Sequence, residues 1–356
     1  MYEERFATVL SILEENNGCQ RIATDHGSGK ALVFLSFLPK VHVGDKVKIN
    51  TTASALKLGT GGWDIVTSLV SGSPFSLTGK GHIMKARYLP SQHSVLSVDD
   101  PEHPDHWIFQ QPFTLKGKKI LLAELHSMIP VLVGALIALS PKSKIGVVLS
   151  DEASLPLNMS SHLSVMKDWE GVKTITVGQA FGGKEEATTI PNALQWLSVK
   201  YNADYMIISM GPGTTGTNTP WGFSGLSLAN WSNLVGALEG IPVWTARISF
   251  QDERKRHRGI SHHTLTPLQD FTLAYSFLAL PYLAKEKHQV LYQQSSLLMK
   301  KNKHIKVLWQ AVDELELKWK EWKKDYPLSL TTMGRPIEDD PPFYLSCLSA
   351  ALAVAG

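Results

Sequence analysis

Five apolar runs in the middle of the chain constrain its fold more than any other feature. Each run is of strand length and carries few polar residues: KKILLAEL, KIGVVLS, VKTITVG, DYMIISMG and IPVWTARIS. Segments long enough for helices, such as MIPVLVGALIAL and IPNALQWLSVKY, lie between the runs. Strands that are buried on both faces and alternate with helices are typical of a parallel sheet in an α/β layer.

The pattern therefore predicts a doubly wound, mostly parallel sheet of five strands, Rossmann-like or flavodoxin-like, between residues 117 and 265. No GxGxxG fingerprint follows the first run, which argues against a bound nicotinamide or flavin dinucleotide. Beyond Thr266, apolar residues recur at helical spacing, so C-terminal helices are expected to pack on this domain up to residue 356. One such stripe consists of Leu308, Val312, Leu315, Trp319 and Trp322.

Residues 1–112 are predicted to form a separate β-rich domain, either a small barrel or a sandwich. Its candidate strands are short and separated by glycine and serine: ALVFLSFLP, VHVGDKVKIN, TGGWDIVTSLV and GHIMKARYLP. The stretch Gly27–Lys30 is similar to a phosphate loop only in part, because Thr24 and Ala31 replace residues that such a loop requires. It predicts a hairpin turn instead. The polar stretch Asp99–His106 is expected to connect the two domains.

Composition narrows the class of protein further. With 356 residues, of which 43% are hydrophobic and 19% charged, the chain is typical of a globular protein with two domains. A net charge of +3 provides no broad basic field for nucleic acid. Cys19 and Cys347 lie near opposite ends of the chain, which argues against a disulfide framework and favours a cytoplasmic location.

The segment Leu121–Leu139 approaches the length of a membrane span, but Glu124, His126 and Pro130 interrupt it. A buried strand that runs into a buried helix explains this segment better, so no membrane span is expected. The start of the chain, MYEERFATVLSILEE, carries acidic residues and has no long apolar core, so no secretory signal is expected there.

The densest group of chemically active side chains follows the fifth apolar run, in RISFQDERKRHRGISHHTLT. It contains one aspartate, three histidines and four arginines: Asp252, His257, His262, His263, Arg247, Arg254, Arg256 and Arg258. Histidine titrates near neutral pH, and arginine binds carboxylate or phosphate through two parallel hydrogen bonds. The combination suits acid–base chemistry, metal binding or capture of an anion, and the residue types alone leave these alternatives open.

Ligands of doubly wound sheets bind at the carboxyl ends of the strands, so the residues that follow each run indicate candidate sites. Glu124 and His126 follow the first run and point the same way if the strand continues, although Glu124 could instead cap the next helix. Asp151 follows the second run and either contacts a ligand or caps a helix. The loop GQAFGGKEEATT after the third run either approaches a ligand or is a mobile surface loop.

The fourth run continues into GPGTTGTNT, residues 211–219. Small residues leave backbone N–H groups free to converge on a phosphate or a carboxylate, and threonine hydroxyls add further donors. A structural Ω-loop is the alternative. If the loop binds a ligand, the contacts are expected from Gly211, Gly213, Thr214, Thr215, Gly216 and Thr217.

A divalent metal is possible at the histidines, but the five-residue spacing of Asp252, His257 and His262 matches no standard zinc motif. In a regular strand, the adjacent His262 and His263 cannot face one point, so one is expected to act and the other to pack. The run DERKRHR could bind nucleic acid, but it lacks interleaved aromatic residues. Nucleic acid is therefore not the expected partner.

Five unusual strings occur in order along the chain: SDEASLPLNMS, GQAFGGKEEATTIPNAL, MGPGTTGTNTPWGFSG, RISFQDERKRHRGISHHTLT and TMGRPIEDDPPF. Together with VGDKVKINTTA and GHIMKARY in the β-rich part, they resemble a bacterial family known as domain of unknown function 3866. The resemblance covers most of the chain. Because the family has no established reaction, the resemblance assigns no catalytic residue and implies only a cytoplasmic bacterial protein of this length.

The sequence as a whole predicts an enzyme, a hydrolase or transferase that acts on a phosphorylated small molecule or a nucleotide. The loop of residues 211–219 would hold the anionic ligand together with Arg247, Arg254 and Arg258. A non-catalytic sensor that binds a nucleotide-like ligand in the same pocket is the alternative, and an assembly protein is a third interpretation. A homodimer is compatible with the first two.

In the enzyme hypothesis, one of the three histidines would serve as the general acid or base. Asp252 or Asp151 would orient that histidine, and Glu124 and His126 would complete the pocket, around a divalent metal if one is bound.

Overall fold

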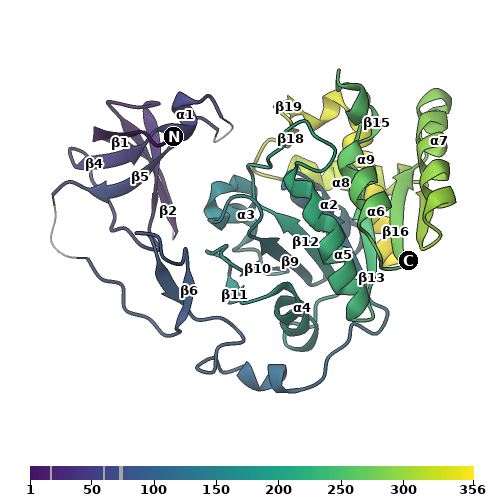
Figure 1. Cartoon of the computed structure of the whole chain (residues 1–356), viewed down its shortest axis with the longest axis horizontal. Coiled ribbons are helices and arrows are strands. Elements are labelled where there is room, and N and C mark those ends of the chain that lie inside the picture. The colour runs from purple at the N-terminus through teal and green to yellow at the C-terminus, as the bar shows by residue number, and fades with distance from the viewer. Residues whose placement is uncertain (17, 59–60, 72–74) are drawn as a thin grey trace. The chain divides into compact units, whose positions relative to one another are not determined.

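A computed structural model describes residues 1–16, 18–58, 61–71 and 75–356 and divides the chain into two compact units, Met1–Leu96 and Ser97–Gly356 (Figure 1). Thr60, the first residue of the predicted strand TGGWDIVTSLV, lies outside the described residues.

The first unit contains a closed barrel whose strands follow the order β1-β2-β3-β5-β4, so the expectation of a small barrel is confirmed. Strands β3 and β5 are parallel, and the other neighbours are antiparallel. A short helix and a two-stranded hairpin accompany the barrel. The elements are β1 (Glu4–Asn16), β2 (Cys19–Thr24), β3 (Lys30–Phe34), β4 (Lys46–Asn50), α1 (Thr52–Ala55), β5 (Asp64–Leu69), β6 (Ile83–Lys85) and β7 (His93–Val95).

Inward side chains on alternate strand positions fill the barrel, among them Val9, Ile22 and Val33. The sequence pattern does not single out β1 because its outer face is also apolar in part: Phe6 and Leu10 are exposed. The stretch Gly27–Lys30 connects β2 to β3 in a hairpin, as predicted.

The second unit is built on an eight-stranded parallel sheet with the order β11-β10-β9-β12-β8-β13-β16-β17 (Figure 1). All five predicted runs are strands of this sheet, and three further strands extend it at the two edges. The strands are β8 (Lys119–Ala123), β9 (Ile145–Ser150), β10 (Val172–Val177), β11 (Glu185–Ala187), β12 (Tyr205–Met210), β13 (Ile241–Thr245), β16 (Ser276–Pro281) and β17 (Ile305–Gln310).

Helices cover both faces of the sheet, so its central strands are apolar on both sides. In β8, Leu121 belongs to one core cluster, whereas Ile120 and Leu122 belong to the other. The helices of the first cluster are α2 (Met128–Leu139), α3 (Ser161–Met166), α8 (Asp313–Lys324) and α9 (Pro341–Ala355). Those of the second are α4 (Ile190–Val199), α5 (Ser227–Ala237), α6 (His262–Asp270) and α7 (Lys285–Lys301).

The expectation of an entirely helical C-terminal part was wrong. Strands β16 and β17 lie in this part and continue the sheet beside β13. Leu308 therefore belongs to β17, not to a helical stripe, and α8 begins only at Asp313. A short apolar run has no periodicity that separates a buried strand from a buried helix, and here the neighbouring strand decides.

The segment Leu121–Leu139 forms the end of β8 and all of α2, as a strand followed by a helix. Among the described residues, no helix has both the length and the apolar character that a membrane crossing requires.

The stretch Asp99–His106 lies in the second unit, which begins at Ser97, and is anchored to α4. Asp105 accepts a hydrogen bond from Trp196 Nε1 at 2.9 Å and forms an ion pair with Lys200 at 2.7 Å. These contacts hold the stretch against the sheet domain.

Candidate functional site

A small pocket is lined mainly by the loop after β12 and by the segment after β13, and half of the predicted site residues line it. Its volume is about 150 Å³. Strand β8 lies between β12 and β13, and the chain leaves the neighbours β8 and β13 in opposite directions, from β8 towards β9 and from β13 towards β16. Such a switch point opens a crevice in a doubly wound sheet, because the connections on its two sides diverge.

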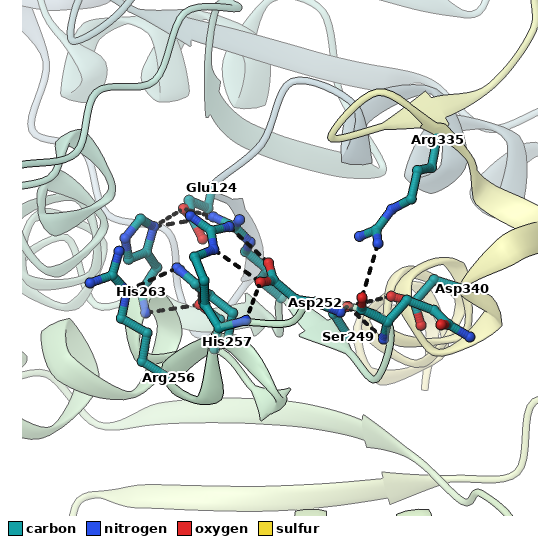
Figure 2. A network of polar contacts seen from close by, with 12 residues as sticks. Glu124, Ser249, Asp252, Arg256, His257, His263, Arg335 and Asp340 are labelled. Carbon is teal, nitrogen blue, oxygen red and sulfur yellow. Dashed lines mark hydrogen bonds and ion pairs between the residues drawn. The ribbon is translucent and has the colours of Figure 1, made fainter. Parts of the chain in front are cut away.

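Beyond β13 the chain forms a small hairpin, β14 (Ile248–Ser249) and β15 (Gly259–Ile260), whose loop carries part of the site (Figure 2). Asp340, at the start of α9, accepts hydrogen bonds from the Ser249 hydroxyl and from the backbone N–H of Phe250. These bonds fix the base of the hairpin beside the sheet.

Glu124 is the buried centre of the site, and its side chain is 1% exposed. Its Oε1 atom accepts hydrogen bonds from Arg247 Nη1 at 3.0 Å and from His263 Nδ1 at 2.7 Å. Arg247 Nη1 also lies 3.1 Å from His263 Nδ1, but both atoms donate to the same oxygen and so do not bond each other. Burial would raise the pKa of Glu124, but Arg247 and His263 outweigh burial and lower it.

The Glu124 contact also fixes the tautomer of His263. A carboxylate can only accept, so the imidazole proton lies on Nδ1 and the lone pair lies on Nε2. This is the arrangement by which a carboxylate orients a histidine in many catalytic and metal sites.

The three histidines meet because α6 begins at His262. Ser261 caps this helix by accepting a hydrogen bond from the backbone N–H of His263 at 3.1 Å, and its Oγ lies 2.8 Å from His257 Nδ1. The ring centroids of His262 and His263 are 4.4 Å apart, and each lies 4.9 Å from that of His257. The expectation that only one of the adjacent histidines would face the site was wrong, because they occupy a helical turn and not a strand, and both line the pocket.

The same three histidines could hold a metal ion. One ring nitrogen of each lies within 4.8 Å of one from each of the others. Asp252, which the sequence spacing linked to this group, does not belong to it.

His257 and His262 are neutral in the folded protein at pH 7. Burial, followed by the charge of Arg247, lowers the pKa of His257 to about 3. Burial, followed by His263, lowers the pKa of His262 to about 4. These two rings are therefore suited to accept hydrogen bonds or bind a cation, and poorly suited to donate a proton.

Asp252 is paired with an arginine. Its carboxylate accepts hydrogen bonds from Arg254 Nε at 2.9 Å and Nη2 at 2.8 Å, and these bonds lower its pKa. Arg254 lines the pocket with its charge already matched, whereas Arg258 is not among the lining residues. Among the described contacts, Glu124 is the carboxylate hydrogen-bonded to a pocket histidine, in the role expected of Asp252 or Asp151.

The loop after β12 contributes only part of its predicted contacts. Thr214, Thr215 and Gly216 line the pocket, whereas Gly211, Gly213 and Thr217 are not among its described lining residues. Gly211 packs against Ser154, where a Cβ atom would lie 2.8 Å from the Ser154 carbonyl oxygen. Gly213 has a φ of +94°, and Thr217 N–H donates to Gly222 O at 2.7 Å. These three residues therefore shape the loop.

Phe223 closes the loop onto the histidines, because its ring stacks on His263 with centroids 4.0 Å apart and planes 2° apart. The sequence analysis did not assign Gly222, Phe223 or Met333 to the site, and it gave Arg256 no role in ligand binding. Arg256 belongs to the cluster that the sequence analysis singled out, so its positive charge was a sufficient signal to predict that it binds the ligand. Nothing in the local sequence indicates Met333, which comes from a hairpin near the C-terminus.

Asp151 and His126 do not line this pocket. Asp151 accepts a hydrogen bond from the backbone N–H of Gln179 at 2.8 Å and lines a second pocket at the ends of β9 and β10. His126 is largely buried near His162, and burial, followed by the charge of His162, lowers its pKa to about 4.

A comparison with models of protein families places the chain among known sequences. The model described as protein of unknown function (DUF3866) matches residues 30–351. The chain belongs to this family. Searches of curated proteins and of solved structures found no match. The DUF3866 match begins at Lys30, the first residue of β3, and so covers part of the first unit and most of the second.

Proposed function

We propose that this DUF3866 protein is an enzyme, a hydrolase or a transferase, that acts on a phosphorylated small molecule or a nucleotide. One observation carries the proposal: three arginines and three histidines line the pocket, and no carboxylate stands among the described lining residues. Both nearby carboxylates, Glu124 and Asp252, are engaged by arginines. A ligand with negative charge is the natural partner of such a lining.

Arg256 is the cation best suited to bind the ligand. Arg247 pairs with Glu124 and Arg254 with Asp252, whereas the hydrogen bond described for the Arg256 side chain goes to the uncharged ring of His257, at 3.3 Å. The hydroxyls of Thr214 and Thr215 lie on the opposite loop and add donors. The pocket, at about 150 Å³, is smaller than the roughly 300–1,000 Å³ of sites that enclose a whole ligand. It would therefore take the phosphate end of the substrate.

The position of the pocket supports a Rossmann-like or flavodoxin-like mode of binding, in which ligands occupy the switch point of a doubly wound sheet. The chemistry would centre on His263. Glu124 orients its ring, and its Nε2 lone pair is available to take a proton from an attacking group or to bind a Lewis acid.

A non-catalytic binding module is the second candidate. The low pKa values of His257 and His262 favour it, because neither histidine holds a proton near pH 7 that it could pass to a leaving group. Such a module would bind the same ligand without forming a product.

The test is a thermal-shift screen of the full chain with inorganic phosphate, pyrophosphate, sugar phosphates and nucleotides. Each compound that raises the melting temperature is then followed by ³¹P NMR for turnover. We expect Arg256→Ala to weaken binding by about tenfold or more, in line with a lost charge-assisted hydrogen bond of roughly 1.5–3 kcal/mol. Lys255→Ala is the matched control, because Lys255 is exposed on the same short helix, η4 (Lys255–His257), and does not line the pocket.

Binding without product would support the module in place of the enzyme. Equal losses in Arg256→Ala and Lys255→Ala would contradict a specific anion site in the pocket, and so would a screen without any shift.

A further inference from the structure

We propose that His257, His262 and His263 bind one divalent transition metal ion of the zinc type, with a fourth coordination position open to the pocket. The ring nitrogens that could ligate lie within 4.8 Å of one another. In a tetrahedral zinc site with Zn–N distances of about 2.0–2.1 Å, ligand nitrogens are roughly 3.3 Å apart. Metal binding would therefore draw these nitrogens closer together by up to about 1.5 Å.

The hydrogen bonds around two of the rings show on which nitrogen each lone pair lies. Glu124 accepts the Nδ1 proton of His263, so the lone pair of that ring lies on Nε2. Arg256 Nε can only donate, and it lies 3.3 Å from His257 Nε2, so this ring also carries its lone pair on Nε2 and donates from Nδ1 to Ser261 Oγ. A metal at His257 Nε2 would replace the long hydrogen bond from Arg256 and leave that guanidinium to the ligand.

His262 supplies the third lone pair, and its surroundings give independent support for a metal. Its Nε2 atom is buried and has no hydrogen-bond partner among the described residues. Buried polar atoms are almost always hydrogen-bonded, because an unsatisfied one costs about 1–3 kcal/mol. A bound metal would satisfy this nitrogen, which the surrounding protein does not.

The groups behind the ligands are those that metal-binding histidines typically have. Glu124 holds His263 through its distal nitrogen and Ser261 holds His257 in the same way. Partners of this kind set the tautomer and the direction of the ligand lone pair. Ser261 also caps α6, so the turn that places His262 beside His263 is built by the residue that orients His257.

Three neutral imidazoles favour zinc or a similar borderline ion over magnesium or calcium, which prefer oxygen ligands. The ion would keep its full charge of +2, because no carboxylate stands among the three ligands. It would therefore attract a phosphate oxygen or a water molecule at the open position. Only this attraction of a phosphate oxygen or a water molecule rests on the proposed function; the binding of the ion by the three histidines does not. Binding at His263 Nε2 would exclude that atom as a proton acceptor, since it has a single lone pair.

The test is the metal content of the full chain after removal of metals with a chelator and reconstitution with Zn²⁺ or Co²⁺. We expect about one ion per chain by mass spectrometry and, for Co²⁺, visible absorption bands of a four-coordinate site. His262→Ala is the main variant, because no described hydrogen bond of His262 Nε2 is lost with the ring. It should bind less than about one tenth of an ion under the same conditions, as should His257→Ala.

Two further variants separate a metal site from a general effect of losing a side chain. His42→Ala removes a histidine whose side chain is 82% exposed, and it should keep the full metal content. Glu124→Gln should retain the three ligands and weaken Zn²⁺ binding by about 10–100-fold, the usual effect of losing a carboxylate behind a ligand. Circular dichroism of each variant verifies that the fold is retained.

The proposal is overturned if the reconstituted wild-type chain holds less than about one tenth of an ion, or if His262→Ala and His257→Ala bind metal as the wild type does. Full metal content without turnover on any phosphorylated compound would contradict the proposed enzyme and leave the metal site standing. Turnover in a chain that takes up no metal on reconstitution would contradict the metal site and leave the enzyme standing.

Discussion

Two pockets open at the carboxyl edge of the same sheet, and their carboxylates have different partners. In the second pocket, Asp151 accepts from the backbone N–H of Gln179, and Glu152 accepts from Trp231 Nε1 at 3.0 Å. In the histidine pocket, Glu124 accepts from Arg247 and His263. The first set of partners belongs to the framework of the fold, and the second set reaches the pocket surface.

The partners of a buried carboxylate distinguish a structural role from a role in a binding site. A backbone N–H or an indole N–H is a donor only. Unlike a histidine ring, it has no second nitrogen whose lone pair a ligand could contact. His263 instead passes the effect of Glu124 to its far nitrogen, which faces away from the carboxylate. Four measurements test this distinction between the two pockets.

The largest effect is expected for Glu124→Ala. The substitution leaves Arg247, which is 6% exposed, without a counter-charge in the interior, and breaking such a buried pair costs about 3–5 kcal/mol. Urea denaturation at pH 7 measures the loss. The double variant Glu124→Ala, Arg247→Met removes both charges and should recover a large part of it. A loss below about 1 kcal/mol would mean that Glu124 is not the buried centre we describe.

His126 tests what burial does without a partner, since its lowered pKa comes from burial and the nearby His162. The unfolded chain takes up a proton near pH 6.5, whereas folded His126 does so only near its pKa of about 4. Stability should therefore fall by up to about 3 kcal/mol as the pH drops from 6.5 to 4. His126→Gln should lose this part of the slope. The free energy of unfolding of the variant, relative to that of the wild type, should therefore be higher at pH 4.5 than at pH 7. Identical slopes for both proteins would show that His126 titrates normally.

Asp151→Ala should have a smaller effect, a loss of about 1–2 kcal/mol, because it removes a hydrogen bond to a single backbone N–H and leaves no buried charge behind. The measurement is the same urea titration as for Glu124→Ala. Metal content and ligand binding in the histidine pocket should be unchanged. A loss of either would mean that the two pockets are coupled.

The smallest effect is expected for Arg254→Ala. The arginine side chain is 49% exposed, and an ion pair at such a position contributes about 0.5 kcal/mol or less. Its charge is already matched by Asp252, so the affinity for phosphate compounds should change far less than in Arg256→Ala. A comparable loss of affinity in both variants, measured by calorimetry, would contradict this assignment.

Much of the fold could be predicted, because each piece of it has a local signal. The runs from KKILLAEL to IPVWTARIS became the central strands, and the stretch Gly27–Lys30 became a hairpin. Strands β16 and β17 were missed since their runs are too short to carry a period, and only pairing with β13 makes them strands. Of the cluster behind β13, three histidines and three arginines line one pocket, whereas Asp252 and Arg258 are not among its described lining residues.

The amino-acid sequence alone was enough to predict the layer architecture and the segment that carries the candidate site, because periodicity and composition act over a few neighbouring residues. It could not determine that Glu124 lies 2.7 Å from His263, residues that are 139 positions apart. Nor could it assign His262 and His263 to one helical turn capped by Ser261. Hydrogen bonding is decided by distances of a few tenths of an ångström between distant segments, and only the packing of the sheet, the hairpin and α6 sets those distances.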